Sequence, residues 1–290
     1  MPRLNSLNIL LDPTGKMLLA EAYDGVLDNV QKTTISTSIK NTDLSGDPTA
    51  GTVEAKRFAN ASSKEYGTAR TAGKGDAVKG KPVTIPIDVD REFVEEVEQK
   101  DISLLGVDGL IAKRSAKHAM RFAAELDEAF FAEGYEAGTE FTPDEGVTAI
   151  ADILEDMIVD LEETKNEYID GIPREMMSLT LNVKTYSKMR KYLDTVSKSN
   201  VDTTDEEFIA FHGVPVKSSN RLPSGVAAEL MVNGSIAQPV RSTPYAAEKI
   251  PMSEAFAIEL FFYYGTKAVT PETIRYLSDE TASDAESDTP

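Results

Sequence analysis

Two strand patterns on either side of a long glycine-rich stretch constrain the fold of this chain more than any other feature. Residues 52–60 and 83–90 each favour a β-strand, and Pro86 marks the second as an edge strand or part of an isolated ribbon. The stretch between them, Ala61 to Gly80, contains four glycines and almost no large apolar side chain. Because a two-stranded ribbon alone is only marginally stable in water, the predicted hairpin arm must rest on another surface.

The predicted arm is basic, although the whole chain is strongly acidic, with a formal net charge of −19. Residues 55–81 hold seven lysines and arginines against two acids, whereas residues 88–101 hold seven acids against two basic residues. We expect the arm to find its electrostatic complement on another copy of the same chain; a flexible, solvated loop is the alternative interpretation. The predicted contacts between subunits are Lys56, Arg57, Lys64, Arg70, Lys74, Lys79 and Lys81.

The composition of the chain argues against several classes of function. The net charge of −19 would repel phosphate backbones, so sequence-specific nucleic-acid binding is not expected, whereas a container for DNA tolerates such repulsion. The chain has no cysteine, which excludes disulfides, thiolate metal sites and cysteine nucleophiles. The sequence shows neither a secretion signal nor a run that approaches the roughly 18 apolar residues of a membrane span.

Apolar residues at helical spacing predict four helices, at 16–31, 107–133, 147–161 and 183–196. The longest carries alanines at spacings of three and four, which would let another element approach it closely. Asn182 is placed to cap the last of the four. The polar segment from Gln31 to Gly51 is typical of an extended arm that crosses a surface.

Short strands are predicted in the second half of the chain. Asn233-Gly234 predicts a tight hairpin turn between two of them, and a segment that is apolar on both faces predicts a buried strand at 255–264. The tail 278–290 has five acids and no basic residue, which is typical of disorder. The predicted strands are 178–181, 213–218, 228–233, 235–240, 255–264 and a last strand through Ile274 and Tyr276.

No motif in the chain identifies a catalytic, cofactor or metal site. The stretch Gly67 to Gly75 has the wrong spacing for a phosphate-binding loop, and no helical pattern follows it. His118 and His212 are the only histidines and have no nearby ligand cluster, so each is interpreted as a surface or satisfied structural residue. We therefore predict that the chain is not an enzyme and that it needs no cofactor.

The order of these elements resembles the HK97-fold major capsid proteins of tailed double-stranded DNA bacteriophages. The resemblance covers nearly the whole chain and depends on the order and spacing of its segments. It implies an α+β fold with an N-terminal arm, an extended β-hairpin called the E-loop, a long spine helix, a peripheral (P) domain and an axial (A) domain. The segments that carry it are RSAKHAMRFAAELDEAFF (114–131), LTLNVKTYSKMRKYL (179–193), GVPVKSSNRLP (213–223) and ELFFYYGTKAVTPETIRYL (259–277).

The resemblance also implies a division of the chain and a structural role. Copies would form the hexamers and pentamers of an icosahedral head, with E-loops lying across neighbouring subunits and DNA enclosed. The implied parts are the N-terminal arm (1–48), the E-loop hairpin (49–90), the P-domain (91–146, with the spine helix at about 107–133), the A-domain (147–240), return strands (241–277) and an acidic, disordered tail (278–290).

The partners implied by the resemblance are the chain itself, a portal protein and packaged DNA bound without sequence specificity. Because only 48 residues precede the E-loop, a separate scaffolding protein is also implied. The chain would be made and assembled in the host cytoplasm, would end in the virion and would not involve a membrane. Lys74, Lys79 and Lys81 are candidates for the lysine that crosslinks the founding member, but no partner asparagine is identified, so no crosslink is predicted.

Two alternative functions stay open. The nearest is an encapsulin, a cellular nanocompartment shell of the same fold that encloses a cargo enzyme. The long glycine-rich E-loop and the extended arm favour the virus, whereas a helix at 16–31 is also compatible with an encapsulin. A soluble acidic enzyme without an identifiable site is the more distant alternative, and particle size with enclosed DNA would separate the three.

Overall fold

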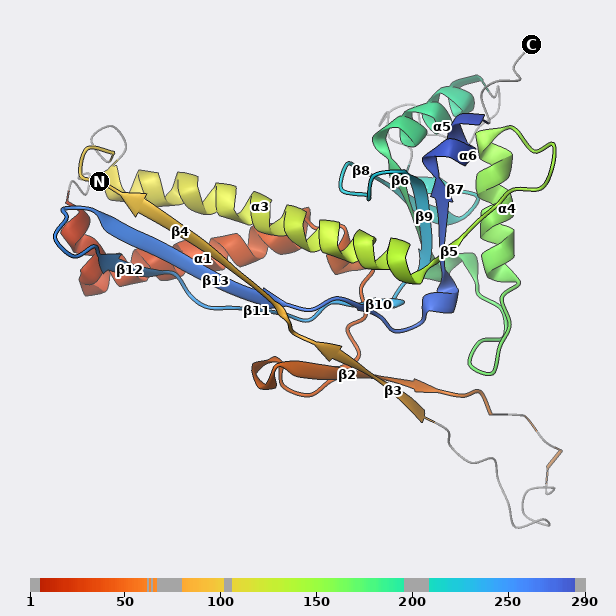
Figure 1. Cartoon of the computed structure of the whole chain (residues 1–290), viewed down its shortest axis with the longest axis horizontal. Helices are drawn as coiled ribbons and strands as arrows, with labels where there is room; N and C mark the ends of the chain where they lie inside the picture. The colour runs from red at the N-terminus through yellow and green to blue at the C-terminus, as the bar shows by residue number, and fades with distance from the viewer. Residues whose placement is uncertain are drawn as a thin grey trace.

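One long helix joins the two parts of this chain. The computed structural model describes residues 6–61, 63, 65–66, 80–101, 106–195 and 209–284. Helix α3, Gly106–Ala137, has 32 residues, which makes it roughly 48 Å long at 1.5 Å per residue. Figure 1 shows α3 running along an elongated layer of strands and ending against a block of sheet and helices. The long helix predicted over 107–133 is confirmed.

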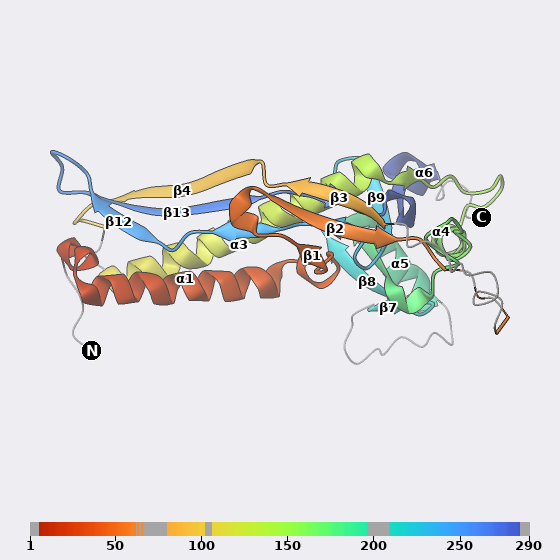
Figure 2. The ribbon, with the colours of Figure 1, turned by 90° about the horizontal axis from the view of Figure 1, so that it is seen from below.

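The elongated part is a narrow antiparallel sheet covered by two helices. Its central strand β13 pairs with β4 from Phe256 opposite Val97 to Tyr264 opposite Val89. Helix α1 packs against α3, and Figure 2 shows both helices on the same side of the sheet. The elements are η1 (Leu7–Leu11), α1 (Pro13–Thr33), β4 (Val89–Val97), β11 (Val240–Ser242), β12 (Ala246–Lys249) and β13 (Phe256–Tyr264). The helix predicted over 16–31 is confirmed as α1.

One face of β13 builds the core of the elongated part. Every second residue from Phe256 to Tyr264 is buried, and the residues between them are half-buried. Phe262 packs against Phe122 of α3 with ring centroids 4.0 Å apart, and Leu260 lies in the same cluster. Burial of each such side chain contributes about 1.5–3 kcal/mol, so this face holds the sheet against α3.

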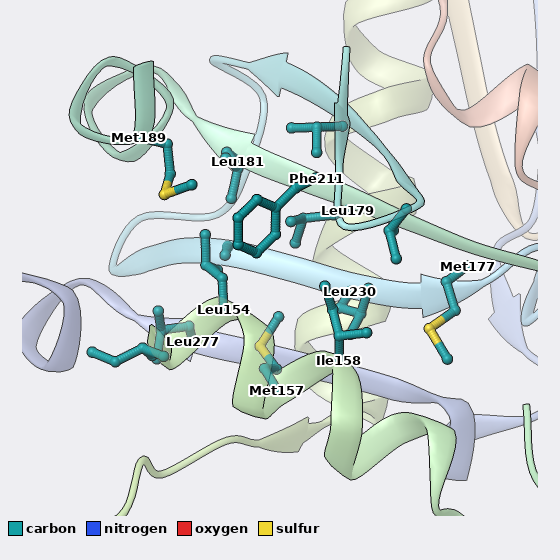
Figure 3. Packing of buried hydrophobic residues seen from close by; sticks show 14 of the residues in the cluster. Leu154, Met157, Ile158, Met177, Leu179, Leu181, Met189, Phe211, Leu230 and Leu277 are labelled. Carbon is teal, nitrogen blue, oxygen red and sulfur yellow. The ribbon is translucent and has the colours of Figure 1, made fainter. Parts of the chain in front are cut away.

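The second part is a six-stranded sheet in the order β5-β15-β9-β6-β8-β7. Figure 3 shows its main core, where Leu154 and Ile158 of α4 pack among Leu179 and Leu230 of the sheet. The end of α3 covers the other face through Phe130 and Phe131. The elements are β5 (Thr139–Glu140), α4 (Ile150–Glu162), β6 (Met177–Asn182), α5 (Val183–Thr195), β7 (Ala210–Phe211), β8 (Val214–Ser219), β9 (Val226–Val232), β15 (Ile274–Ser278) and α6 (Asp279–Asp284).

Two small sheets complete the fold. Strands β1 (Leu44–Ser45), β2 (Thr52–Phe58) and β3 (Gly80–Pro86) form a three-stranded antiparallel sheet, and β10 (Ile236–Ala237) pairs with β14 (Lys267–Ala268). The strand predicted over 52–60 is therefore confirmed. The strand predicted over 83–90 is wrong in its bounds, because the chain changes sheets between Pro86 and Val89. The amide of Ile87 donates to the carbonyl of Gly51 at that point, which ends the β2–β3 ladder.

The predicted cap of α5 is confirmed. The side-chain oxygen of Asn182 accepts a hydrogen bond from the amide of Thr185 at 2.7 Å, which satisfies one of the free amides of the first turn. The amide group of the same side chain donates to the carbonyl of Val226 and to the carboxylate of Asp279. Asn182 therefore also ties β9 and the start of α6 to this helix.

The hairpin predicted around Asn233-Gly234 is wrong. Strand β9 pairs with β6 and β15, whereas the short strand that follows the turn pairs with β14. The turn exists, with Gly234 at φ +92°, but its amides bind other segments: Asn233 donates to Met176 and Gly234 donates to Ile39. The two strands separate because each reaches a different sheet.

The prediction of a disordered tail over 278–290 is wrong for its first seven residues. Ser278 ends β15, and Asp279–Asp284 form α6, whose Ala282 is buried in the core of the second part. Acidic residues in the first turn of a helix interact favourably with its dipole, which the composition of the tail did not reveal. Residues 285–290 lie outside the described residues.

His118 is a buried structural residue, one of the two interpretations that its sequence context allowed. It lies on α3, is stacked on Phe93 of β4, and its Nδ1 is 2.6 Å from the hydroxyl of Tyr245. Its Nε2 is 3.2 Å from a carboxylate oxygen of Glu95, but without the orientation of a hydrogen bond. Burial, and next the Arg114 guanidinium, lowers the pKa of His118 to about 4, so the ring is neutral at pH 7.

We predict that this buried ring makes the fold sensitive to acid. Between its ordinary pKa of 6.5 and the folded-state pKa of about 4, the unfolded chain binds more protons than the folded chain. The free energy of unfolding should therefore be fully present above pH 6.5 and fall as the pH drops toward 4, by up to about 3 kcal/mol. The free energy of unfolding of His118→Gln, measured by urea denaturation, should depend less on pH than that of wild type. His212→Gln, a change at the exposed histidine, is the control, and equal slopes for all three proteins would contradict the prediction.

Candidate assembly surface

The arm predicted from the sequence is a hairpin that projects from the rest of the chain (Figure 1). Strands β2 and β3 pair antiparallel from Thr52 opposite Pro86 to Phe58 opposite Gly80. Strand β1 adds two residues to the outer edge of β2. The tip, which includes Lys64, Arg70, Lys74 and Lys79, lies outside the described residues. The stretch Gly67 to Gly75, whose spacing does not fit a phosphate-binding loop, also lies outside the described residues.

The base of the arm rests on its own chain. Val53, Ala55 and Ile85 are buried and pack with Ala237 and Val269 in a small apolar cluster. This cluster satisfies part of the requirement that the ribbon be supported by another surface. This apolar support ends before Phe58 at the far end of β2, which is 58% exposed.

Arg57 is engaged within its own chain. Its guanidinium pairs with the carboxylate of Glu272, which lies in η5 (Pro271–Thr273), and lies 4.4 Å above the ring of Tyr168. The side chain of Asn166 donates to the same carboxylate at 3.3 Å, and the amide of Asn60 donates to the carbonyl of Glu167. Arg57 therefore fixes the direction in which the arm leaves the molecule.

Lys56 and Lys81 are the described basic residues of the arm that remain exposed. Lys81 lies opposite Arg57 in the β2–β3 register, and Lys56 lies opposite Pro82 on the other face of the hairpin. Neither lysine forms an ion pair with another residue of the described ranges. Of the seven predicted subunit contacts, the structure thus places two on open surface and one in an internal ion pair, and the other four lie at the tip that is not described.

The free edge of β3 is poorly suited to pairing with another strand. In a strand, the backbone N–H and C=O groups of alternate residues point to the same edge, so Pro82, Thr84 and Pro86 share the free edge of β3. Neither proline has an N–H group to donate there. The carbonyl of Thr84 already accepts a hydrogen bond from Nζ of Lys267 at 3.2 Å. This edge of the arm is therefore protected against edge-to-edge association.

An acidic face lies on the side of the β4–β13 sheet that α1 and α3 leave uncovered (Figure 2). Here Tyr263 lies opposite Asp90, Phe261 opposite Glu92 and Ala257 opposite Glu96. The prediction that residues 255–264 are buried on both faces is therefore wrong, because aromatic and aliphatic residues on this face are only half-buried. The carboxylates that define the acidic face are Asp90, Glu92, Glu96, Glu248 and Glu259.

Asp127 anchors the polar segment that follows α1. This residue of α3 is fully buried, and its carboxylate accepts hydrogen bonds from the amides of Ile35 and Ser36, at 3.0 and 2.9 Å, and from Arg221 at 2.7 Å. Ile39 is also buried, so the expectation that residues 31–51 merely cross a surface is wrong for this stretch. The sequence contained one clue, an acid between the core residues Leu126 and Phe130 on the apolar stripe of α3.

Two lysines lie close enough to Asp127 to respond to its charge. Burial lowers the pKa of Lys40 and Lys217, and the Asp127 carboxylate opposes that shift. Lys217 of β8 also donates to the hydroxyl of Ser38. The buried Asp127 carboxylate therefore interacts with Lys40 of the N-terminal segment and with Lys217 and Arg221 of the second part.

No cluster suited to metal binding appears in the described part of the chain. No group of three or more histidine, aspartate or glutamate side chains there could hold a metal ion. The exposed His212 is bound to Glu155, whose carboxylate also pairs with Arg174. Among the same residues, none of the helices has both the length and the apolar character needed to cross a membrane.

Comparisons with known proteins identify the fold through solved structures. No family model matches the sequence, and a search of curated proteins found no match. A chain of Mycobacterium phage Che8 is 17% identical with a TM-score of 0.61, and 78% of this chain and 84% of that chain are covered. A capsid structure of the cyanophage P-SCSP1u is 14% identical with a TM-score of 0.62 and coverage of 84% and 88%.

A virus-like particle from Pyrococcus furiosus is similar as well. It is 15% identical with a TM-score of 0.55, and 89% of this chain and 97% of that chain are covered. These likenesses extend over most of each chain and show that this protein has the HK97-type capsid fold. The fold class expected from the order of sequence elements is thereby confirmed.

We predict that removal of the Asp127 carboxylate is strongly destabilising. Asp127→Ala leaves Arg221 and two backbone amides without their acceptor in a buried site, so the free energy of unfolding should fall by about 3–5 kcal/mol. Urea denaturation measures this loss. Glu128→Ala changes the exposed neighbour on the same helix and should cost less than about 0.5 kcal/mol. Similar losses for the two variants would contradict the anchoring role of Asp127.

A second prediction concerns the base of the arm. In a double-mutant cycle with Arg57→Ala and Glu272→Ala, we expect a coupling energy of about 1 kcal/mol or more, because the pair is partly buried. Protease cleavage between residues 52 and 60 should accelerate to a similar extent in either single variant. Strictly additive effects of the two substitutions would show that the pair does not hold the arm.

Proposed function

We propose that this chain is the major capsid protein of a tailed double-stranded DNA bacteriophage, with a structural and not an enzymatic role. The observation that carries the proposal is the fold, which is similar over most of its length to capsid structures such as that of the cyanophage P-SCSP1u. An elongated sheet-and-helix part, a projecting hairpin and a separate block suit a subunit whose contacts are mainly with copies of itself. Such copies would assemble into the hexamers and pentamers of an icosahedral head.

The described elements correspond to the parts of such a subunit in our proposal. The hairpin β2–β3 is the E-loop, α3 is the spine helix, and the β4–β13 sheet with α1 belongs to the P-domain and N-terminal arm. The six-stranded sheet with α4 and α5 is the A-domain. The packaged partner is DNA bound without sequence specificity, and a separate scaffolding protein and a portal protein act during assembly in the host cytoplasm, before the subunit becomes part of the virion.

The charges of the chain support contacts between copies through the arm. Lys56 and Lys81 are exposed on the hairpin, and the undescribed tip carries further basic residues. The acidic face presents five carboxylates beside half-buried aromatic side chains, a surface that would complement a basic, apolar-poor ribbon. We propose that the arm of one copy lies on the acidic face of another and that this contact is non-covalent.

The similarity to a virus-like particle from Pyrococcus furiosus supports a second candidate, a shell protein that encloses cellular cargo. Helix α1, Pro13–Thr33, precedes the hairpin arm, which is compatible with that alternative. The contents of native particles distinguish the two: nuclease-protected double-stranded DNA supports the phage head, and an enclosed enzyme without DNA supports the cellular shell.

We predict that charge reversal on the arm blocks assembly without unfolding the subunit. The variant combines Lys56→Glu and Lys81→Glu with Arg70→Glu and Lys74→Glu, and leaves Arg57 intact because it stabilises its own chain. When the variant is co-expressed with the scaffolding protein, light scattering should detect no particles. The midpoint temperature of thermal unfolding of the free subunit should change by less than a few degrees.

Matched variants show whether the position of the charges matters. Lys113→Glu with Lys117→Glu reverses two exposed charges on α3 and should leave assembly intact. Adding Asp90→Lys and Glu92→Lys to the arm variant should restore part of the assembly if the acidic face is the complement. Normal particles from the arm variant would show that these charges are only solvated, and a wild-type chain that stays monomeric with its scaffold would contradict the proposed function.

A further inference from the structure

A buried carboxylic acid without a partner lies beneath the end of α3. Glu229 is in the middle of β9, its exposed fraction is 0%, and neither of its carboxylate oxygens has a hydrogen-bond partner among the described residues. Most buried polar side chains in proteins are hydrogen-bonded, and a charged carboxylate in such a place would cost several kcal/mol. The assembly contacts proposed above do not involve Glu229, so its presence needs a separate explanation.

Helix α3 closes over Glu229 because it carries glycine at the point of contact. A Cβ atom placed on Gly134 would lie 1.6 Å from Oε1 of Glu229, so even alanine cannot occupy this position without a shift. One turn later, a Cβ on Gly138 would lie 2.8 Å from Cγ2 of Ile274 on β15. The end of α3 therefore approaches the sheet more closely than a helix with a side chain at Gly134 could.

The groups around Glu229 offer no charge that would stabilise an ionised carboxylate. On the sheet it lies opposite Thr180 of β6 and Tyr276 of β15. Desolvation is the one resolved influence on Glu229, and it raises the pKa of this carboxyl well above the ordinary range. Titratable groups on this side of the sheet include Tyr276 on β15, Asp127, Glu133 and Tyr135 on α3, Lys217 on β8 and Lys267 on β14, whereas β6 contributes none. Arg275 of β15 lies opposite Leu230 and therefore on the other face of the sheet.

The charged groups in that set already have other partners. Asp127 binds Arg221, Glu133 accepts from the amide of Ala268, Lys217 binds Ser38 and Lys267 binds Thr84. Tyr276 is packed edge-to-face against Tyr135, at a centroid distance of 4.7 Å. None of them is available to neutralise Glu229, so the acid must stay protonated or the site must open.

We propose that Glu229 is a proton-operated latch between the end of α3 and the six-stranded sheet. The neutral acid allows the last turn of α3 and Gly138, which follows it, to close on β9 and β15. Loss of its proton to solvent creates a buried carboxylate that only water can solvate, and water enters when the end of α3 lifts from the sheet. The contacts that then break are the hydrogen bond from Ala268 to Glu133 and the packing of Tyr135 on Tyr276.

This latch lies where the two parts of the molecule meet. Helix α3 runs along the elongated part (Figure 1), and its last turns lie against the second part through Phe130, Phe131 and Gly134. A change in the packing of its last turns therefore changes how the two parts are joined. The inference concerns the subunit alone and does not depend on the proposed function, because it is tested on the unassembled chain.

Amide hydrogen exchange of residues 130–140 tests the latch on the full-length subunit from pH 5 to 10. After correction for the intrinsic exchange rate, wild-type protection should be constant only below the ordinary glutamate pKa of 4.5. Between that value and the raised pKa of the closed state, it should fall by about tenfold per pH unit, because opening over that interval releases one proton. Glu229→Gln has the same shape but cannot ionise, and its protection should change by less than about twofold over the range. Glu136→Gln, an exposed change on the same turn, should behave like wild type.

Infrared spectroscopy gives an independent readout on the wild-type chain. The carbonyl stretch of a protonated carboxylic acid should be present at pH 7, be absent from Glu229→Gln, and disappear at the upper end of the pH interval over which protection falls. The proposal is overturned if that band is absent from wild type at pH 7, if wild-type protection does not change with pH, or if Glu229→Gln loses protection in the same way. Should Glu229→Gln fail to fold, the joint disappearance of band and protection in wild type decides the question.

Discussion

The packing of α3 on two different sheets is the constraint on which the rest of this structure depends. Its early and middle turns bury Ile111 and Phe122 in the core of the elongated part, and its later turns bury Phe130 and Phe131 against the six-stranded sheet. One rigid helix thereby fixes the relation of two separate cores. Its last turns approach the second sheet through glycine, because any side chain at Gly134 would collide with Glu229.

The same helix also holds the segments that reach outward. Asp127 receives two amides from the stretch after α1 and a guanidinium from Arg221, so the N-terminal segment is tied to the point where the two parts meet. The hairpin arm is held at its base by an apolar cluster and by Arg57, while Lys56 and Lys81 stay exposed. A fixed base with an open basic end is a suitable arrangement for contacts with another copy of the chain.

The features that sequence reasoning predicted correctly are those set by local chemistry. Helical spacing of apolar residues located α1 and α3, and Asn182 was recognised as a cap because its side chain binds an amide only three residues away. The hairpin β2–β3 was predicted because its strands are neighbours along the chain. The family resemblance, which depends on the order of such elements, predicted the fold class that the solved structures confirm.

The errors share one physical cause, which is competition between partners far apart in sequence. Asn233-Gly234 makes a turn, but β9 gains more by pairing with β6 and β15 than by pairing with the next strand. The segment 83–90 changes sheets because β4 pairs along its whole length with β13. The tail forms α6 because Asn182 and the second core receive it, which no property of the tail itself would indicate.

The sequence by itself therefore determined the elements of this protein, their order, and the opposite charges of the arm and of the segment that follows it. These properties depend on side-chain pattern, composition and contacts between near neighbours. Only the tertiary structure decided that Arg57 is bound within its own chain, that Asp127 is an anchor and that Glu229 is enclosed without a partner. Burial decides each of these, because a charged group acts differently in water and under a helix, and burial depends on segments that meet only in the folded chain.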